Sequence, residues 1–452
     1  MSEQAAPRYR FGPLEERGFL LGLRLSQVLL LLVPLVVGVV LFWLLPSWLM
    51  LLVDLMALLL AGVVCFCPWE GRSLQEWIPI HARFGVERLL GGDRHIVHAP
   101  LVGHTGASPA TVELPPSLRG LEILTAPVRG GGELGVIRDR GRHTYAAVLL
   151  CRGRSFALLD SDEQARKLNA WGDVLSAVGR DGSVVERLQW LDVVVPDDGE
   201  AAVRHLRRHL VMPVDSAPVR SLVSLLEDAA PVSQVHETHL VVRINASHPA
   251  VRRLGTRRGE EQAACTVLAQ QLAGLSDRLR RADIVVEGVL TPRRVARIIR
   301  LAYDPAAREP IARAGIQGAD PGVDPSDAWP MGTHDLWSML RTDSAVHRTY
   351  WVRQWPRTEV GPDWLSPPLL GCGRHMRVSM VIEPVDLARA GRAVPYRHTA
   401  HITVTAATPD ALEVACIDVE QSAIAARLQL RRMVGEQADA FTLTLPLCRG
   451  LA

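Results

Sequence analysis

The sequence predicts an α+β protein with a transmembrane helical hairpin near its N-terminus and a larger cytoplasmic body. Two observations predict it: a pair of long apolar runs before residue 67, and strand-type and helix-type patterns that alternate afterwards. The chain has 452 residues, of which 48% are hydrophobic and 22% charged, so it can bury a sizeable core. Its formal net charge of +2 provides no overall field that would attract nucleic acid.

The hairpin is predicted over residues 27–66. The first run, 27–45, contains about 19 residues without a charge, and the second, 49–66, is interrupted only by Asp54. At 1.5 Å per residue, each run can cross a hydrocarbon core of about 30 Å. A secretory signal peptide has a shorter apolar region and no second run, so two spanning helices joined by a short turn are the better interpretation.

Arginines predict the orientation of this hairpin. They lie on both sides of it and are absent from the turn, so the positive-inside rule places both ends in the cytoplasm. The segment 1–26 is then cytoplasmic, and the plasma membrane is the expected location. The flanking arginines are Arg8, Arg10, Arg17, Arg24, Arg72, Arg83, Arg88 and Arg94, and the tryptophans expected near the interfaces are Trp43, Trp48 and Trp69.

Asp54 is the one ionisable residue inside the two runs. Such a residue often contacts a protein partner or lines an ion path, since burying it in lipid is costly. Asp54 also lies about six residues from the turn, about 9 Å deep, where water can reach it. Both interpretations stay open.

Residues 67–116 are predicted to be a juxtamembrane segment and linker. Within them, residues 71–79 have the pattern of a short amphipathic helix along the membrane interface, and this helix contains Trp77.

The first α+β unit is predicted over 117–303, with a helical insert at 199–229. Strands are expected at 143–151, 184–195, 238–245 and 284–290. Helices are expected from Asp160 to about Val178, at 260–281, and from Pro292 through Tyr303.

A segment rich in Pro, Gly and Asp, 304–342, is predicted to link this unit to a second one at 343–452. The second unit is expected to contain strands at 348–355, 375–383, 399–406 and 440–447, a short helix or turn at 364–370 and a long helix at 410–433. Both units then follow the order β-α-β-β-α-β, which predicts two ferredoxin-like (split β-α-β) folds.

Several kinds of chemistry are excluded or unsupported. Of the 50 basic residues only Lys167 is a lysine, and its surroundings do not form a P-loop. The seven cysteines are scattered and lack the paired spacing of a zinc knuckle, which favours free thiols. Residues 236–239 (His-Glu-Thr-His) are one residue short of a zinc-protease motif. His205 and His209 lack a third metal ligand nearby, so they do not predict a zinc site. The three glycines at 130–132 lie between two strands and not before a helix, so they do not predict a phosphate-binding loop. We therefore expect no catalytic residues, no metal and no cofactor.

Two helices have basic faces. The arginines concerned are Arg204, Arg207 and Arg208 on one, and Arg293, Arg294, Arg297 and Arg300 on the other. Because arginine is so frequent in this chain, such clusters are expected on solvent-exposed helix faces without any binding role. Direct contact with DNA is a weaker alternative.

Short segments resemble components of type IV secretion systems. Residues 11–18 and 22–27, which include Arg17, Gly18, Arg24 and Gln27, resemble the PrgI-type two-helix inner-membrane subunit, and residues 71–77 match its segment after the helices. Residues 348–356, 378–384 and 441–447 resemble the N-terminal, non-motor domain of the conjugative ATPase. The whole chain resembles fused proteins of this kind from actinobacterial mobile elements, although the segment between Pro384 and Thr399 is shorter than that pattern.

This resemblance implies a non-enzymatic membrane component of a type IV-like secretion or conjugative DNA-transfer apparatus. Its expected partners are a separately encoded ATPase of the conjugative type, other channel subunits and the lipid bilayer, in a homo- or hetero-oligomer. Two alternatives stay open. One is a core membrane subunit of a type VII system, and the other is a membrane-anchored enzyme or ligand-binding protein with a pocket between the two α+β units.

Overall fold

The computed structural model describes most of the chain and divides it into two compact units, residues 12–93 and the body from residue 94 onward. Each unit is described separately. The described residues are 25–44, 46–69, 72–97, 113–128, 131–153, 159–179, 182–196, 205–206, 209–213, 215–229, 234–317, 322–371, 374–384 and 396–451.

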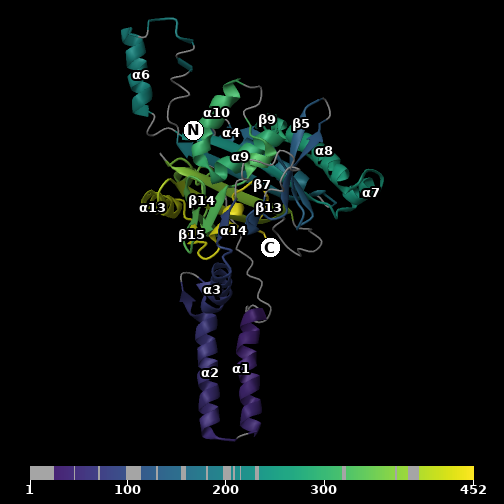
Figure 1. The fold of residues 1–452 in the computed structure, drawn as a ribbon, viewed down its shortest axis with the longest axis vertical. Helices are drawn as coiled ribbons and strands as arrows, with labels where there is room; N and C mark the ends of the chain where they lie inside the picture. The colour runs from purple at the N-terminus through teal and green to yellow at the C-terminus, as the bar shows by residue number, and fades with distance from the viewer. Residues whose placement is uncertain are drawn as a thin grey trace, which may run out of the picture. The chain divides into compact units, whose positions relative to one another are not determined.

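The smaller unit contains two apolar helices, α1 (Leu25–Leu44) and α2 (Trp48–Phe66) (Figure 1). Both are long and apolar enough to cross a membrane, and few of their residues are buried within the chain. The Ser47 hydroxyl caps α2 by accepting a hydrogen bond from the Leu49 amide at 3.4 Å. The two predicted helices are thus present, with a short turn between them.

Polar contacts join the ends of these helices. The side-chain amide of Gln27, at the start of α1, donates to the Cys65 carbonyl at 3.5 Å. After α2, the two-residue strands β1 (Pro68–Trp69) and β2 (Arg72–Ser73) pair, and α3 (Leu74–Leu89) follows. The guanidinium of Arg72 lies 5.4 Å from the ring centroid of Trp77, which is buried. Helix α3 extends well beyond the predicted segment 71–79.

Asp54 packs against the facing helix. A Cβ added at Gly38 of α1 would overlap the Asp54 carboxyl group, so a larger residue there would displace this carboxyl from its position. Gly38 is buried and Asp54 half-buried. The Asp54 side chain therefore occupies a notch in its own hairpin.

Replacing Gly38 by leucine is expected to separate α1 from α2. The larger side chain would push out the Asp54 carboxyl, and overpacking of this kind costs about 1–3 kcal/mol. The purified variant should unfold at a lower concentration of sodium dodecyl sulfate, followed by circular dichroism. Val39→Leu, at an exposed position of the same helix, is the control and should behave as the wild type. If both variants unfold at the same concentration of sodium dodecyl sulfate, the packing of Asp54 against Gly38 does not hold the two helices together.

The larger unit is built on one sheet of 13 strands (Figure 1). The strand order is β3-β10-β11-β12-β14-β13-β7-β8-β6-β5-β4, with β15 paired to β12 and β9 paired to β6. The strands are β3 (Arg94–Ile96), β4 (Leu121–Pro127), β5 (Glu133–Asp139), β6 (Thr144–Arg152), β7 (Val185–Pro196), β8 (Gln234–Asn245), β9 (Val285–Val289), β10 (Gly332–Asp335), β11 (Leu340–Arg341), β12 (Val346–Gln354), β13 (His375–Pro384), β14 (Tyr396–Ala406) and β15 (Gln429–Arg432).

Two sets of four antiparallel strands within this sheet have the same order. One set reads β9-β6-β8-β7 and the other β15-β12-β14-β13. Their outer strands β7 and β13 pair with each other along seven residues, from Leu188↔Ile382 to Val194↔Met376. The two predicted α+β units therefore share one continuous sheet.

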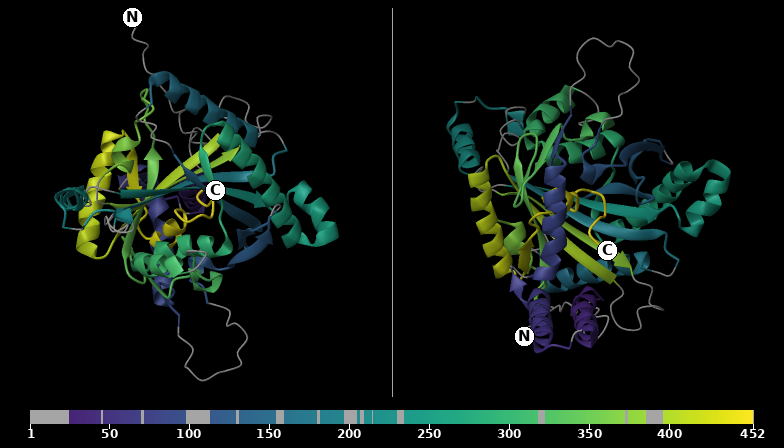
Figure 2. Two further views of the ribbon diagram at one scale, coloured as in Figure 1. Left: turned by 90° about the horizontal axis from the view of Figure 1, so that it is seen from above. Right: turned by 60° about the horizontal axis from the view of Figure 1, so that its bottom comes forward.

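Helices lie on both sides of the strands (Figure 2), while α6 stands apart from the sheet (Figure 1). The helices of the body are α4 (Ser161–Val178), α6 (Ala217–Ala229), α7 (Pro249–Arg258), α8 (Glu260–Arg281), α9 (Pro292–Tyr303), α10 (Arg308–Gln317), α11 (Ser366–Leu369), α13 (Pro409–Ala425) and α14 (Gln437–Thr442), with short 3-10 turns at Pro116–Leu118, Pro305–Ala307 and Pro325–Ala328.

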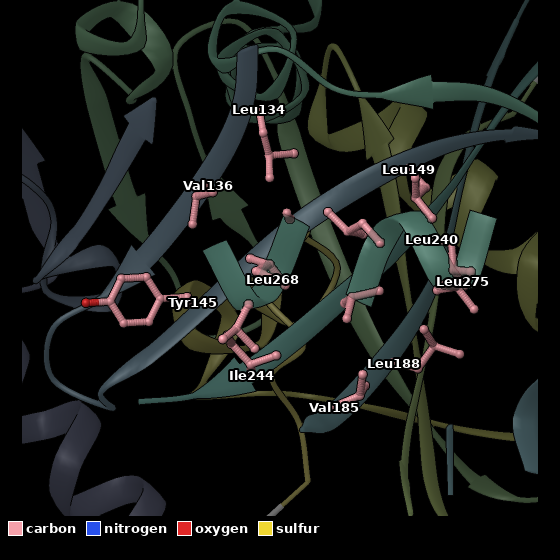
Figure 3. Close-up of a cluster of buried hydrophobic side chains, with 14 of the residues drawn as sticks. Leu134, Val136, Tyr145, Leu149, Val185, Leu188, Leu240, Ile244, Leu268 and Leu275 are labelled. Carbon is pink, nitrogen blue, oxygen red and sulfur yellow. The ribbon is translucent and has the colours of Figure 1, made fainter. Parts of the chain in front are cut away.

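The largest hydrophobic cluster lies under α8. Figure 3 shows Leu268 and Leu275 of this helix among side chains of β5, β6, β7 and β8, including Leu149 and Leu240. The predicted bounds of α8 are confirmed. Acidic residues fill its first turn and arginines its last, which complements the helix dipole. In the second half of the sheet, α13 covers a corresponding cluster.

The opposite face is covered by α9, α14 and the residues that follow α14. Helix α9 has its predicted bounds, with Thr291 as the N-cap and Pro292 in the first turn. A polar network also joins this face to the C-terminal segment. The buried amide of Gln189 donates to the Ser379 hydroxyl at 2.8 Å and to the Leu445 carbonyl at 2.9 Å, and its oxygen accepts from the Cys448 amide at 2.8 Å.

Three predicted segments in the second half of the body also differ from the structure. The helix predicted over 410–433 ends at Ala425, Arg427 adopts a positive φ of 58°, and residues 429–432 form β15. The strand predicted over 440–447 is absent, because α14 and turns occupy this stretch. There, the hydroxyls of Thr442 and Thr444 donate to the carbonyls three residues earlier, which favours turns. The predicted linker 304–342 contains α10, β10 and β11.

Candidate functional site

A pocket of about 310 Å³ opens where β6, β7, β8 and β13 meet α9 and α10. Its lining combines apolar and charged side chains from these elements and from β9. The lining residues are Leu150, Cys151, Arg152, Val193, Val235, His236, Glu237, His239, Glu287, Leu290, Arg294, Arg297, Ile298, Leu301, Arg308, His375 and Arg377.

The strand register brings residues from both halves of the sheet to this pocket. Glu237 on β8 lies opposite Val193 on β7, which lies opposite Arg377 on β13. Two residues along β8, His239 lies opposite Leu150 on β6. Since alternate residues of a strand share a face, these side chains all point to the same side of the sheet.

Arg377 is the most buried cation of the pocket, at 2% exposure. Its Nη2 donates to the Leu301 carbonyl at 3.1 Å, and its guanidinium lies 5.5 Å from the ring centroid of Phe441. Within the described part of the chain, Nη1 has no hydrogen-bond partner. Burial disfavours the charged guanidinium and lowers the pKa of Arg377 to about 9.

Two glutamates balance part of the positive charge. Glu237 pairs with Arg308 at 3.1 Å and with Arg297 at 3.7 Å. Burial acts to raise the pKa of Glu237, but these arginines outweigh it and hold the pKa below its ordinary value. Glu287 pairs with Arg152 at 2.6 Å. With the histidines neutral, five arginines against two glutamates leave the lining with a formal charge of +3.

Histidines add further polar groups to the lining. His239 is 2% exposed, and burial lowers its pKa. Burial, together with Arg377 and Arg308, lowers the pKa of His375 to about 3. In contrast, a hydrogen bond to Asp192 at 2.8 Å raises the pKa of His236.

These low pKa values predict acid sensitivity. Burial also lowers the pKa of His401 to about 3, so at pH 4 the folded chain keeps His375 and His401 neutral while the unfolded chain protonates them. The free energy of unfolding should therefore fall as the pH drops from 6.5 towards 3, by at most about 1.4 kcal/mol per pH unit for each histidine. Urea midpoints measured across this range would show the slope.

The double variant His375→Gln/His401→Gln tests the cause. Its stability should change less steeply with pH below 6.5 than that of the wild type. A variant with an unchanged slope would assign the acid sensitivity to other groups.

The predicted basic face of α9 is divided in the structure. Arg294 and Arg297 line the pocket. Arg293 donates to the Gly322 carbonyl at 3.3 Å, and Arg300 pairs with Asp304 at 2.7 Å. Because α9 turns by about 100° per residue, Arg293 and Arg300 serve other contacts of the helix.

The remaining predicted site residues do not belong to this pocket. Gln27, Asp54 and Trp77 lie in the smaller unit, as does Trp69, whose side chain is outside the described part. Arg17, Gly18, Arg24, Arg204, Arg207 and Arg208 lie outside the described residues. Within the described residues, no three His, Cys, Asp or Glu side chains gather closely enough to hold a metal ion.

Comparison with known proteins does not assign the chain. No protein-family model matches it. No curated protein matches its sequence either. The proposed function therefore rests on the geometry of the pocket and on the two apolar helices.

Proposed function

We propose that this chain is a non-enzymatic membrane component of a type IV-like secretion or conjugative DNA-transfer apparatus. It anchors in the plasma membrane, with both termini cytoplasmic, and docks a separately encoded ATPase there. The observation that supports this best is the combination of two exposed apolar helices with a large α+β body. Exposed apolar helices need a lipid or protein environment, and the body offers a broad surface for partners.

We further propose that the body consists of two ferredoxin-like units. The strand orders β9-β6-β8-β7 and β15-β12-β14-β13 support this, because each corresponds to the order 4-1-3-2 of a split β-α-β fold. Edge pairing of β7 with β13 joins the units.

Purification in mild detergent from the native membrane tests the main proposal. A conjugative-type ATPase and channel subunits should be recovered with the full-length protein and identified by mass spectrometry. The Gly38→Leu variant tests whether an intact hairpin is needed, with Val39→Leu as its control. Recovery of a type VII ATPase would replace this proposal by the type VII alternative, and recovery of no secretion protein would contradict both.

The pocket favours a second function, the binding of a small molecule by the cytoplasmic body. The observation that carries it is a pocket of about 310 Å³, shared by both halves of the sheet, whose lining contains five arginines and two glutamates. An anionic ligand would be stabilised by this excess of positive charge. Native mass spectrometry of the purified protein would detect a retained molecule.

A further inference from the structure

We infer that the pocket binds a small organic molecule through a terminal phosphoryl group. The inference rests on the second function proposed above, ligand binding, and specifies the class of ligand.

Charge favours a doubly charged anion. The lining carries a formal charge of +3 even though Glu237 and Glu287 are ionised within it. A phosphoryl dianion offsets most of this excess, whereas one carboxylate offsets only a third of it. Guanidinium groups also match phosphate geometry, because each can donate two parallel hydrogen bonds.

Arginines of two elements supply positive charge to the pocket wall. Arg377 is 2% exposed, so its charge acts on the pocket from within the protein wall. Arg294 and Arg297 of α9 are half-buried in the lining, and their guanidinium groups supply the donors that a phosphoryl group can contact.

The volume of the pocket and its apolar side chains indicate what the rest of the ligand is like. A volume of about 310 Å³ lies at the lower end of the usual range for small-molecule sites, about 300–1,000 Å³, which excludes dinucleotide cofactors. Apolar side chains of the strands and of α9 line the remaining wall and would contact an apolar or planar organic part. They are Leu150, Val193, Val235, Leu290, Ile298 and Leu301.

Phenyl phosphate is a suitable probe, with benzoate as the matched carboxylate and inorganic phosphate as the group without an organic part. Calorimetric titration of the detergent-solubilised full-length protein, in a phosphate-free buffer, should show the tightest binding for phenyl phosphate. Benzoate and inorganic phosphate should each bind at least about tenfold more weakly. Equal affinity for benzoate would overturn the phosphoryl assignment while leaving ligand binding intact.

Four variants locate the site. Arg294→Gln combined with Arg297→Gln should weaken binding at least about tenfold, and Arg377→Met should also weaken it, because it removes a positive charge from the pocket wall. Arg293→Gln is the control, since it removes a positive charge from the adjacent position of α9, outside the pocket. Glu237→Gln should tighten binding severalfold because it removes a negative charge beside the site, whereas simple damage to the pocket would weaken binding.

The outcomes separate the proposals. Phenyl phosphate binding that is unchanged by the Arg294/Arg297 variant would place the anion elsewhere and overturn the inference. If no probe binds at millimolar concentrations, water fills the pocket and the inference fails, while recovery of the ATPase would still support the secretion proposal. If the purified protein retains a molecule without a phosphoryl group, the proposal of ligand binding stands and the assignment of a phosphoryl group is wrong.

Discussion

Replacing Phe441 by alanine is expected to lower the free energy of unfolding by about 3–5 kcal/mol. Phe441 is fully buried in α14, with ring centroids 4.8 Å from Tyr303 and 4.7 Å from His347. The guanidinium of Arg377 lies 5.5 Å from the Phe441 ring. The substitution therefore removes a large buried ring and leaves a cavity beside a buried cation.

Urea unfolding of the full-length protein in detergent, followed by tryptophan fluorescence, would measure the loss. Val414→Ala on α13 is the control, because Val414 is 62% exposed and its truncation should change stability by less than about 0.5 kcal/mol. A loss below about 1 kcal/mol for Phe441→Ala would show that α14 contributes little to the core.

Replacing Gln189 by leucine has the second largest expected effect, a loss of about 2–4 kcal/mol. The leucine has a similar size but cannot hydrogen-bond, so the Leu445 carbonyl and the Cys448 amide would remain buried without their side-chain partner. Each unsatisfied buried group costs about 1–3 kcal/mol. Ser379 on β13 would also lose its bond to this amide.

The same urea titration would measure this effect, with Gln429→Leu as the control. Gln429 is exposed on β15, so losing its amide should leave stability nearly unchanged. Similar stabilities for the two variants would contradict a structural role for the Gln189 network. A rescue by Gln189→Glu is not expected, because a buried carboxylate would face the Leu445 carbonyl.

Local signals in the sequence predicted the elements that have clear caps and periodicity. The start of α9 at Thr291-Pro292 and the apolar face of α8 were both found where they were expected. The C-terminal stretch was predicted wrongly, because the alternation of Thr and Leu over 442–445 resembles a strand. In the structure, the threonine hydroxyls bond to nearby carbonyls and Gln189 binds the turns that follow.

The pocket could not be predicted from local patterns. Glu237, Arg297 and Arg377 come from three distant segments, and only the pairing of β7 with β8 and β13 brings their elements together. One signal was present in the sequence. Arg377 is a charged residue within a stretch of strand that is buried on both faces, and such residues commonly mark a polar site. The basic face of α9 was noticed, but only half of it belongs to the pocket.

Pairing between distant segments has a consequence for how the chain folds. Gln189 and Cys448 are 259 positions apart, and the ion pair of Asp139 with Arg449 joins residues 310 positions apart. Such high contact order predicts slow folding of the larger unit, whereas α1 and α2 form from neighbouring residues. Until β13 is made, β7 presents an unpaired edge, which is prone to aggregate. During synthesis, this edge therefore stays exposed until the residues of β13, which follow about 180 positions later, have left the ribosome and paired with it.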